Sequence, residues 1–158
     1  LGHSGGGGIA LLAAEKFQKI KKVITWAAVA DFEERLPDEE QLAQWKKAGV
    51  YFIRNGRTKQ DMPMKFQFVD CLEKHKTKLN IEHAVIQLDK PLLIVHGKED
   101  ETVNYENAER IKSWAKRAQL ELIQKCNHTF NGKHPWEEVT LPEATLKAIE
   151  VTTIFLTT

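Results

Sequence analysis

Short apolar runs that alternate with amphipathic segments limit the fold of this chain more than any other feature. Residues 23–29 form a nearly continuous apolar run, and residues 91–96 form another. The shorter segment 120–123, in which three apolar residues flank Glu121, is also interpreted as a strand. Runs of this kind are typical of strands buried in a parallel sheet. We therefore expect three strands, with at least one sheet edge open.

Helical patterns occupy the segments between and after these runs. One follows the glycine cluster over residues 9–20 and ends in a basic run at 19–22. Others cover residues 81–88 and 105–118, and Pro142 suits the first turn of a last helix. Strands that alternate with helices predict an α/β fold, a parallel sheet with helices on both faces.

Residues 31–80 differ in character, since they are charged and contain no long apolar strand. We interpret them as a mostly helical insertion within one domain of residues 1–158. The patterns in it predict a helix over 38–48 ending at Gly49, a hairpin, and a helix over 64–76. The hairpin would pair residues 51–54 with 57–60 around a type I′ turn at Asn55-Gly56.

Composition excludes several classes of function. The 158 residues suit one domain, and 23 basic against 22 acidic residues give a net charge of +1. This balance argues against a nucleic-acid or membrane-surface partner, and no apolar run is long enough to span a membrane. Cys71 and Cys126 make no disulfide framework, so we expect a cytoplasmic protein. Because the chain begins with Leu1, we expect it to be a piece of a longer protein.

The densest glycine cluster contains a serine motif. Gly2-His3-Ser4-Gly5-Gly6 matches G-x-S-x-G, in which a serine occupies a sharp strand-to-helix turn. Small residues at both glycine positions would let the strand and helix backbones approach, and the Gly5 amide would face a developing oxyanion. The alternatives are a flexible glycine-rich terminus or a phosphate-binding loop, although the lysine of a P-loop is absent.

A serine hydroxyl needs a base, and the base needs an orienting group. Asp100 follows the strand at 91–96, and His128 follows the strand at 120–123. All three side chains would lie at carboxyl ends of strands, where open α/β sheets place their sites.

Three motifs, at residues 2–6, 96–103 and 127–130, make the chain resemble the C-terminal half of an α/β-hydrolase. The resemblance covers essentially the whole chain and is to the dienelactone-hydrolase-like and serine-esterase branches. The order Ser, Asp, His along the chain is the one this family uses. The resemblance implies that Ser4 is the nucleophile, Asp100 the orienting acid, His128 the base and Gly5 an oxyanion donor, and that residues 31–80 are the lid.

The resemblance also implies what is absent. The family takes a second oxyanion donor from its N-terminal half, and the strand leading into the serine belongs to that half too. Losing one oxyanion donor costs about 10²–10³ in turnover. We therefore expect the N-terminal half of the fold to be missing and little activity from these residues alone.

Each assignment has an alternative. Glu99 and Glu101 compete with Asp100, and Asp31 could orient a base if the geometry allowed it. His134 competes with His128, and Cys126 is interpreted as a small buried residue rather than a nucleophile. His96 is interpreted as a hydrogen-bonded structural residue. Candidate substrate-binding residues, which could equally be packing residues, are His3, Trp26, Tyr51 and Phe66.

The sequence thus predicts a serine hydrolase that acts on a small carboxylic ester or related acyl compound, without metal or cofactor. The alternative is a catalytically incomplete fragment that serves as a folding or interaction domain. In either case, an open sheet edge would favour self-association. Which ester, thioester, lactone or peptide is cleaved does not follow from the sequence, because one triad serves them all.

Overall fold

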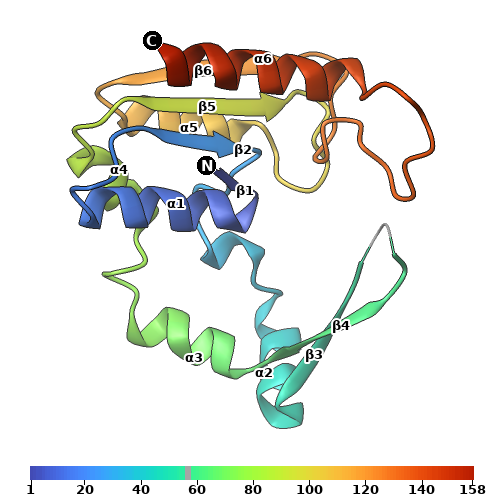
Figure 1. Ribbon diagram of the computed structural model, residues 1–158. Helices are drawn as coiled ribbons and strands as arrows, with labels where there is room; N and C mark the ends of the chain where they lie inside the picture. The colour runs from blue at the N-terminus through green and yellow to red at the C-terminus, as the bar shows by residue number, and fades with distance from the viewer. Residues whose placement is uncertain (56–57) are drawn as a thin grey trace. The chain divides into compact units, whose positions relative to one another are not determined.

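The computed structural model describes residues 1–55 and 58–158 (Figure 1). The chain forms two compact units, one of Leu1–Asp31 with Asn80–Thr158 and the other of Phe32–Leu79. The second unit falls within the segment that the sequence marks as an insertion. Its role as a lid stays a prediction.

The first unit is built on a parallel sheet with the strand order β1-β2-β5-β6. Its strands are β1 (Gly2–His3), β2 (Val23–Trp26), β5 (Leu92–Gly97) and β6 (Ala118–Ile123). The predicted parallel α/β sheet is therefore confirmed, and three of its strands are those expected from the apolar runs. β1 is the correction, because a strand leads into Ser4 after all. It has two residues, too few for any hydrophobic pattern, and pairing with Thr25 and Trp26 of β2 defines it.

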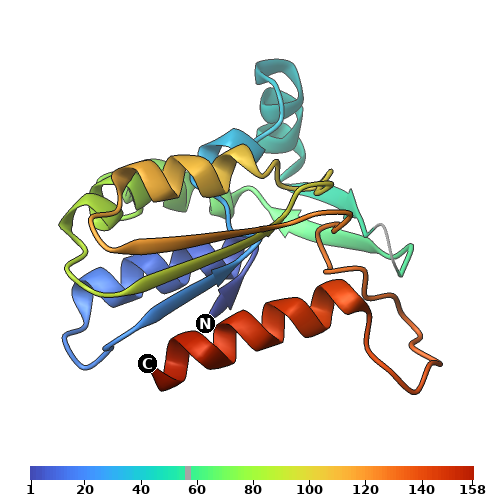
Figure 2. The same ribbon diagram turned by 90° about the horizontal axis from the view of Figure 1, so that it is seen from above.

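Helices cover both faces of this sheet (Figures 1 and 2). α6 (Glu143–Thr157) packs on β5 and β6 from one side. On the other side α1 (Gly5–Lys16) contacts α4 (Ile81–Gln87), which in turn contacts α5 (Glu106–Trp114). This agrees with the predicted layering.

The core follows the alternation of side chains along the strands. In β5, Leu93 and Val95 join a buried cluster with Ala148 and Phe155 of α6. Successive side chains of a strand point to opposite faces, so Leu92 and Ile94, which alternate with Leu93 and Val95, face the other helical layer. All six residues of β5 are buried, as expected for a central parallel strand.

α1 ends earlier than its apolar pattern predicts, at Lys16 rather than near Ile20. Phe17 is already extended, and the ammonium group of Lys90 donates hydrogen bonds to the carbonyl oxygens of Ala14 and Phe17. A lysine from a distant segment therefore satisfies the C-terminal carbonyls that the local basic run was expected to face. Lys22, from that run, instead donates to Phe155 and Leu156 at the end of α6.

The second unit packs around Trp45, which is only 2% exposed. Trp45 lies on α2 (Glu39–Ala48), which begins after Asp38 and ends at Gly49 with φ 75°, as predicted. The rings of Tyr51 and Phe66 lie 5.4 Å and 5.7 Å from the Trp45 ring. This unit also contains a short 3-10 helix, two strands and a further helix: η1 (Glu33–Arg35), β3 (Val50–Arg54), β4 (Asp61–Lys65) and α3 (Gln67–Lys74).

The hairpin of this unit has a different second strand from the predicted one. β4 covers residues 61–65 instead of 57–60, in a register that pairs Arg54 with Asp61 and includes their 3.0 Å ion pair. The predicted helix over 64–76 consequently starts only at Gln67, because the strand takes up Met64 and Lys65. Gly56 of the predicted turn and Arg57 of the predicted second strand lie outside the described residues.

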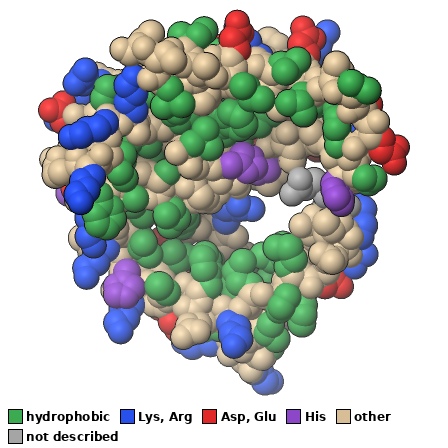
Figure 3. All heavy atoms as spheres, viewed as in Figure 1, with side chains coloured by type: hydrophobic (Ala, Val, Ile, Leu, Met, Phe, Trp, Pro, Cys, Tyr) green, Lys and Arg blue, Asp and Glu red, His purple; other side chains and the backbone are tan. Residues whose placement is uncertain are grey.

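Two surface features of the first unit bear on possible partners. β1 and β6 are the outer strands of the sheet formed by the described residues. Self-association through one of these edge strands stays a prediction. Figure 3 shows hydrophobic side chains at the surface along its upper edge, where α6 lies in the view of Figure 1. The exposed hydrophobic residues of α6 include Leu146 and Ile149. Within the described ranges, no helix has both the length and the apolar character needed to cross a bilayer.

Two adjacent glycines of α1 provide a test of this packing. A Cβ added at Gly7 would lie 2.4 Å from the Ala28 Cβ, whereas one added at Gly6 would meet nothing within 4 Å. We expect Gly7→Ala to lower the free energy of unfolding by about 1–3 kcal/mol through overpacking. The matched control Gly6→Ala should leave it unchanged or raise it by up to about 1 kcal/mol, because alanine favours helix. Urea unfolding of both variants measures this, and equal effects would contradict the packing described.

Candidate active site

Ser4 lies at the sharp turn between β1 and α1, in a conformation that side-chain-bearing residues rarely adopt. Its φ is 55° and its ψ is −128°. Hydrogen bonds hold the turn, since the Ser4 amide donates to the Trp26 carbonyl at 2.9 Å and the Ser4 carbonyl accepts from Gly7 at 2.9 Å. Strained backbone of this kind clusters at functional sites.

The glycines around Ser4 explain how strand and helix come so close. A Cβ at Gly2 would lie 2.2 Å from the Gly6 carbonyl oxygen, so the first glycine of the motif is required, as predicted. The prediction that the last glycine of the motif, Gly6, must also be small was wrong, because a Cβ at Gly6 would have open space. The next residue, Gly7, is the one crowded by Ala28. Gly5 begins α1, so its amide is one of the first N–H groups that have no partner within a helix.

Asp100 is held in the turn that follows β5. Its Oδ1 accepts hydrogen bonds from the backbone amides of Thr102 at 2.9 Å and Val103 at 2.8 Å. Its Oδ2 accepts from His128 Nδ1 at 2.8 Å. Asp100 is 7% exposed, whereas the competing acids Glu99 and Glu101 are exposed to solvent. The structure therefore pairs His128 with the acid that the sequence favours.

These hydrogen bonds decide the charge of the Asp100 carboxyl. Burial alone would raise its pKa, but hydrogen bonds from His128, His96 and the Val103 amide outweigh burial and hold the pKa well below its usual range. Asp100 is therefore a carboxylate at neutral pH, suited to accept from an imidazole.

The loop after β6 carries His128 and is tied to the strand before Ser4. His3 Nε2 donates to the His128 carbonyl oxygen at 2.9 Å, and the two imidazole rings lie 4.7 Å apart. The amide oxygen of Asn127 accepts from the backbone amides of Thr129 and Asn131, which fixes the loop locally. Because His3 directly precedes Ser4, this contact brings the His128 loop to the serine turn.

The remaining candidates lie in other surroundings. His134 is exposed, and the carboxylate within 2.8 Å of His128 Nδ1 is that of Asp100, whereas Asp31 follows β2. Cys126 is fully buried, and burial, together with the charges of Asp100 and Glu99, raises the pKa of its thiol to about 11. A protonated buried thiol is a poor nucleophile, in line with the small buried residue expected here.

Of the candidate substrate-binding residues, three make packing contacts. Trp26 donates from its indole nitrogen to Thr152 of α6 at 3.0 Å and lies 5.0 Å from the Phe130 ring. Tyr51 and Phe66 pack around Trp45 in the second unit. Their part in substrate binding stays a prediction, as does that of His3.

Sequence reasoning missed the tether from His3 to the His128 loop. It joins residues 125 positions apart, and no local pattern marks such a contact. It also missed that buried His96 lies 3.2 Å from Asp100 Oδ2, although the spacing of the two residues around a turn is a signal that could have suggested it.

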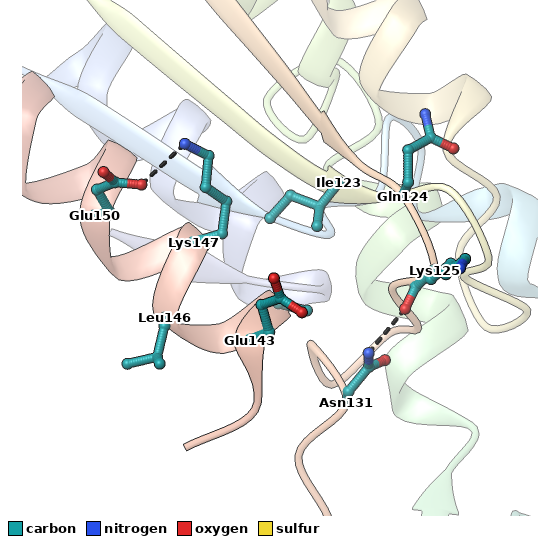
Figure 4. A pocket seen from close by; sticks show the side chains of 9 residues that line it. Ile123, Gln124, Lys125, Asn131, Glu143, Leu146, Lys147 and Glu150 are labelled. Carbon is teal, nitrogen blue, oxygen red and sulfur yellow. Dashed lines mark hydrogen bonds and ion pairs between the residues drawn. The ribbon is translucent and has the colours of Figure 1, made fainter. Parts of the chain in front are cut away.

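A separate hollow of about 730 Å³ lies between the end of β6 and α6 (Figure 4). It contains the Lys147–Glu150 ion pair and the hydrogen bond from Asn131 to the Lys125 carbonyl. Ser4, Asp100 and His128 do not line it. In the part of the chain that the structure describes, no cluster of His, Cys, Asp and Glu side chains suits a metal ion.

Comparison with known proteins identifies the fold. No protein-family model and no curated protein matches the sequence. The esterase domain of a Rhodothermus marinus protein matches with a TM-score of 0.62 at 21% identity, over 98% of this chain and 59% of that one. Est1E from Butyrivibrio proteoclasticus matches with 0.65 at 22%, over 98% and 58%. Alpha/beta hydrolase domain-containing protein 10 from mouse matches with 0.69 at 20%, over 99% and 60%.

The sheet and helices therefore form part of an α/β-hydrolase fold, as predicted. The chain spans 58% to 60% of the length of these three solved structures. At such identities the likeness concerns the fold alone, and the dienelactone-hydrolase-like branch is not singled out by these neighbours.

The lowered pKa of Asp100 predicts how stability depends on pH. A carboxyl whose pKa is lower in the folded state stabilises the fold above its unfolded pKa of about 4, and this stabilisation is lost as the pH falls toward the folded value. We expect the free energy of unfolding to decrease from pH 5 to pH 2, and Asp100→Asn to lower it at neutral pH and to flatten this decrease. Urea titrations at several pH values measure both effects.

The control for this experiment is Glu101→Gln, which removes an exposed carboxyl from the same turn. It should keep the acid dependence of the parent protein. An equally steep acid dependence in Asp100→Asn would show that Asp100 is not the group responsible.

Proposed function

We propose that this protein is a serine hydrolase that cleaves carboxylic esters or related acyl compounds, with Ser4 as nucleophile, His128 as base and Asp100 as orienting acid. One observation carries the proposal, the 2.8 Å hydrogen bond between Asp100 Oδ2 and His128 Nδ1 in a loop that His3 ties to the Ser4 turn. This contact supports the roles proposed for three residues that are far apart in sequence, because acyl transfer needs a nucleophile, a base and a group that orients the base.

The hydrogen bond to Asp100 determines which imidazole nitrogen can act as the base. A carboxylate only accepts, so the proton of neutral His128 lies on Nδ1. This leaves a lone pair on Nε2, which would take the proton of Ser4 Oγ as that oxygen attacks the substrate carbonyl carbon. Asp100 would then stabilise the imidazolium that forms.

The tetrahedral intermediate would place negative charge on the former carbonyl oxygen. The Gly5 amide at the start of α1 is the donor that this chain offers for it, reinforced by the positive end of the helix dipole. Collapse of the intermediate breaks the bond to the leaving group, which takes the proton from His128. Water, activated by the same imidazole, then releases the acid and restores Ser4.

The fold supports this proposal, because the solved structures with the same fold include esterases. The competing proposal is a catalytically incomplete domain, favoured by the share of those structures that the chain leaves unmatched. Both proposals accept the same fold, so only the reactivity of Ser4 separates them.

A fluorophosphonate probe tests this reactivity. We expect intact-protein mass spectrometry to show a single adduct, which Ser4→Ala abolishes and His128→Ala reduces by about 10³-fold or more in rate. Ser113→Ala is a matched control, because Ser113 is the other serine of the chain and lies on α5, with its hydroxyl donating to the Arg110 carbonyl. It should label like the parent protein.

Circular dichroism would first show that each variant is folded. A folded parent protein that forms no adduct would contradict the proposed activity and favour the incomplete domain. An adduct that persists in Ser4→Ala would contradict the assignment of the nucleophile.

A further inference from the structure

His96 is a fully buried histidine that has no role in the reaction proposed above. It lies in β5, and its side chain is 0% exposed. Its Nε2 lies 2.9 Å from the Val103 carbonyl oxygen and 3.2 Å from Asp100 Oδ2. Both of these atoms are hydrogen-bond acceptors, so Nε2 carries a proton.

The other ring nitrogen shows that His96 is held in one tautomer. Nδ1 is buried and has no hydrogen-bond partner among the described residues. A proton there would be a buried donor without an acceptor, which is costly, whereas a bare lone pair costs less. The surroundings therefore favour a proton on Nε2, directed at the Val103 carbonyl and Asp100, and none on Nδ1.

These contacts close a ring around the carboxylate. The imidazole of His96 donates to the Val103 carbonyl, the Val103 amide donates to Asp100 Oδ1, and Asp100 Oδ2 faces the same imidazole. Each carboxylate oxygen therefore faces two donors. Oδ1 accepts from the amides of Thr102 and Val103, and Oδ2 faces the imidazoles of His128 and His96. The carboxylate cannot rotate without breaking several of these contacts.

We propose that His96 is a positioning residue that fixes the Asp100 carboxylate in the orientation that holds His128, an inference that rests on the proposed function. His96 acts through Asp100 and touches neither the substrate nor the serine. Because it faces the same oxygen as His128, it also draws negative charge from that oxygen and keeps the proton on the base rather than on the acid.

Two substitutions separate donation from packing. His96→Gln keeps an N–H donor at about the reach of Nε2, whereas His96→Leu has similar bulk and no donor. With the fluorophosphonate probe, we expect His96→Leu to lower the limiting rate of Ser4 phosphonylation about tenfold or more, with the half-saturating probe concentration changed less than about twofold. His96→Gln should retain at least about a third of the parent rate.

A second readout does not depend on activity. The proton between His128 Nδ1 and Asp100 should give a low-field ¹H resonance in the parent protein, kept in His96→Gln and shifted or lost in His96→Leu. A merely structural role would destabilise the fold without moving this resonance in the folded protein. A parent-like rate and resonance in folded His96→Leu would overturn the proposal.

The ¹⁵N shifts of the parent protein complete the test even if His96→Leu does not fold. Protonation of His96 at Nε2 is expected, and protonation at Nδ1 would overturn the proposal. If the parent protein shows this tautomer and the low-field resonance but forms no adduct, the proposed hydrolase activity fails while the ring around Asp100 stands. The two failures are therefore distinguishable.

Discussion

The site depends on the hydrogen bonds of the buried Asp100 carboxylate. It joins the turn after β5 to the loop after β6 through His128, and to β5 itself through His96. A buried charge is tolerated only when it is fully hydrogen-bonded, so the turn cannot relax without exposing or protonating this group. Because the buried Asp100 carboxylate needs the hydrogen bond from His128 Nδ1, this bond fixes the position of His128.

The parallel sheet explains why these groups meet. β1, β5 and β6 run in the same direction, so their carboxyl ends lie at the same end of the sheet. Ser4, Asp100 and His128 each follow one of these carboxyl ends. α1 packs so closely on Ala28 that position 7 must be a glycine. The turn into α1 likewise requires a glycine at position 2, where the Gly6 carbonyl approaches. Those glycines belong to the architecture of the serine turn rather than to a flexible terminus.

Much of this arrangement could be predicted, and the exceptions share one physical cause. Nearly continuous apolar runs predicted β2 and β5, because burial on both faces of a parallel sheet leaves a strong local signal. The outer strand β6, of which only Ile123 is buried, was predicted from the shorter segment 120–123. Other features depend on contacts between separate segments. Lys90 binds the end of α1, His3 binds the His128 loop, and pairing with β3 sets the register of β4. Local patterns contain no information about such partners, and β1 is too short to have a pattern at all.

If Ser4, His128 and Asp100 act as one unit, a crystal structure of the phosphonylated protein should show all three in contact. We expect phosphorus on Ser4 Oγ, with His128 Nε2 within about 2.6–3.2 Å of the substituted oxygen and His128 Nδ1 still hydrogen-bonded to Asp100. An adduct on another residue, or an imidazole bound to a different carboxylate, would contradict this expectation.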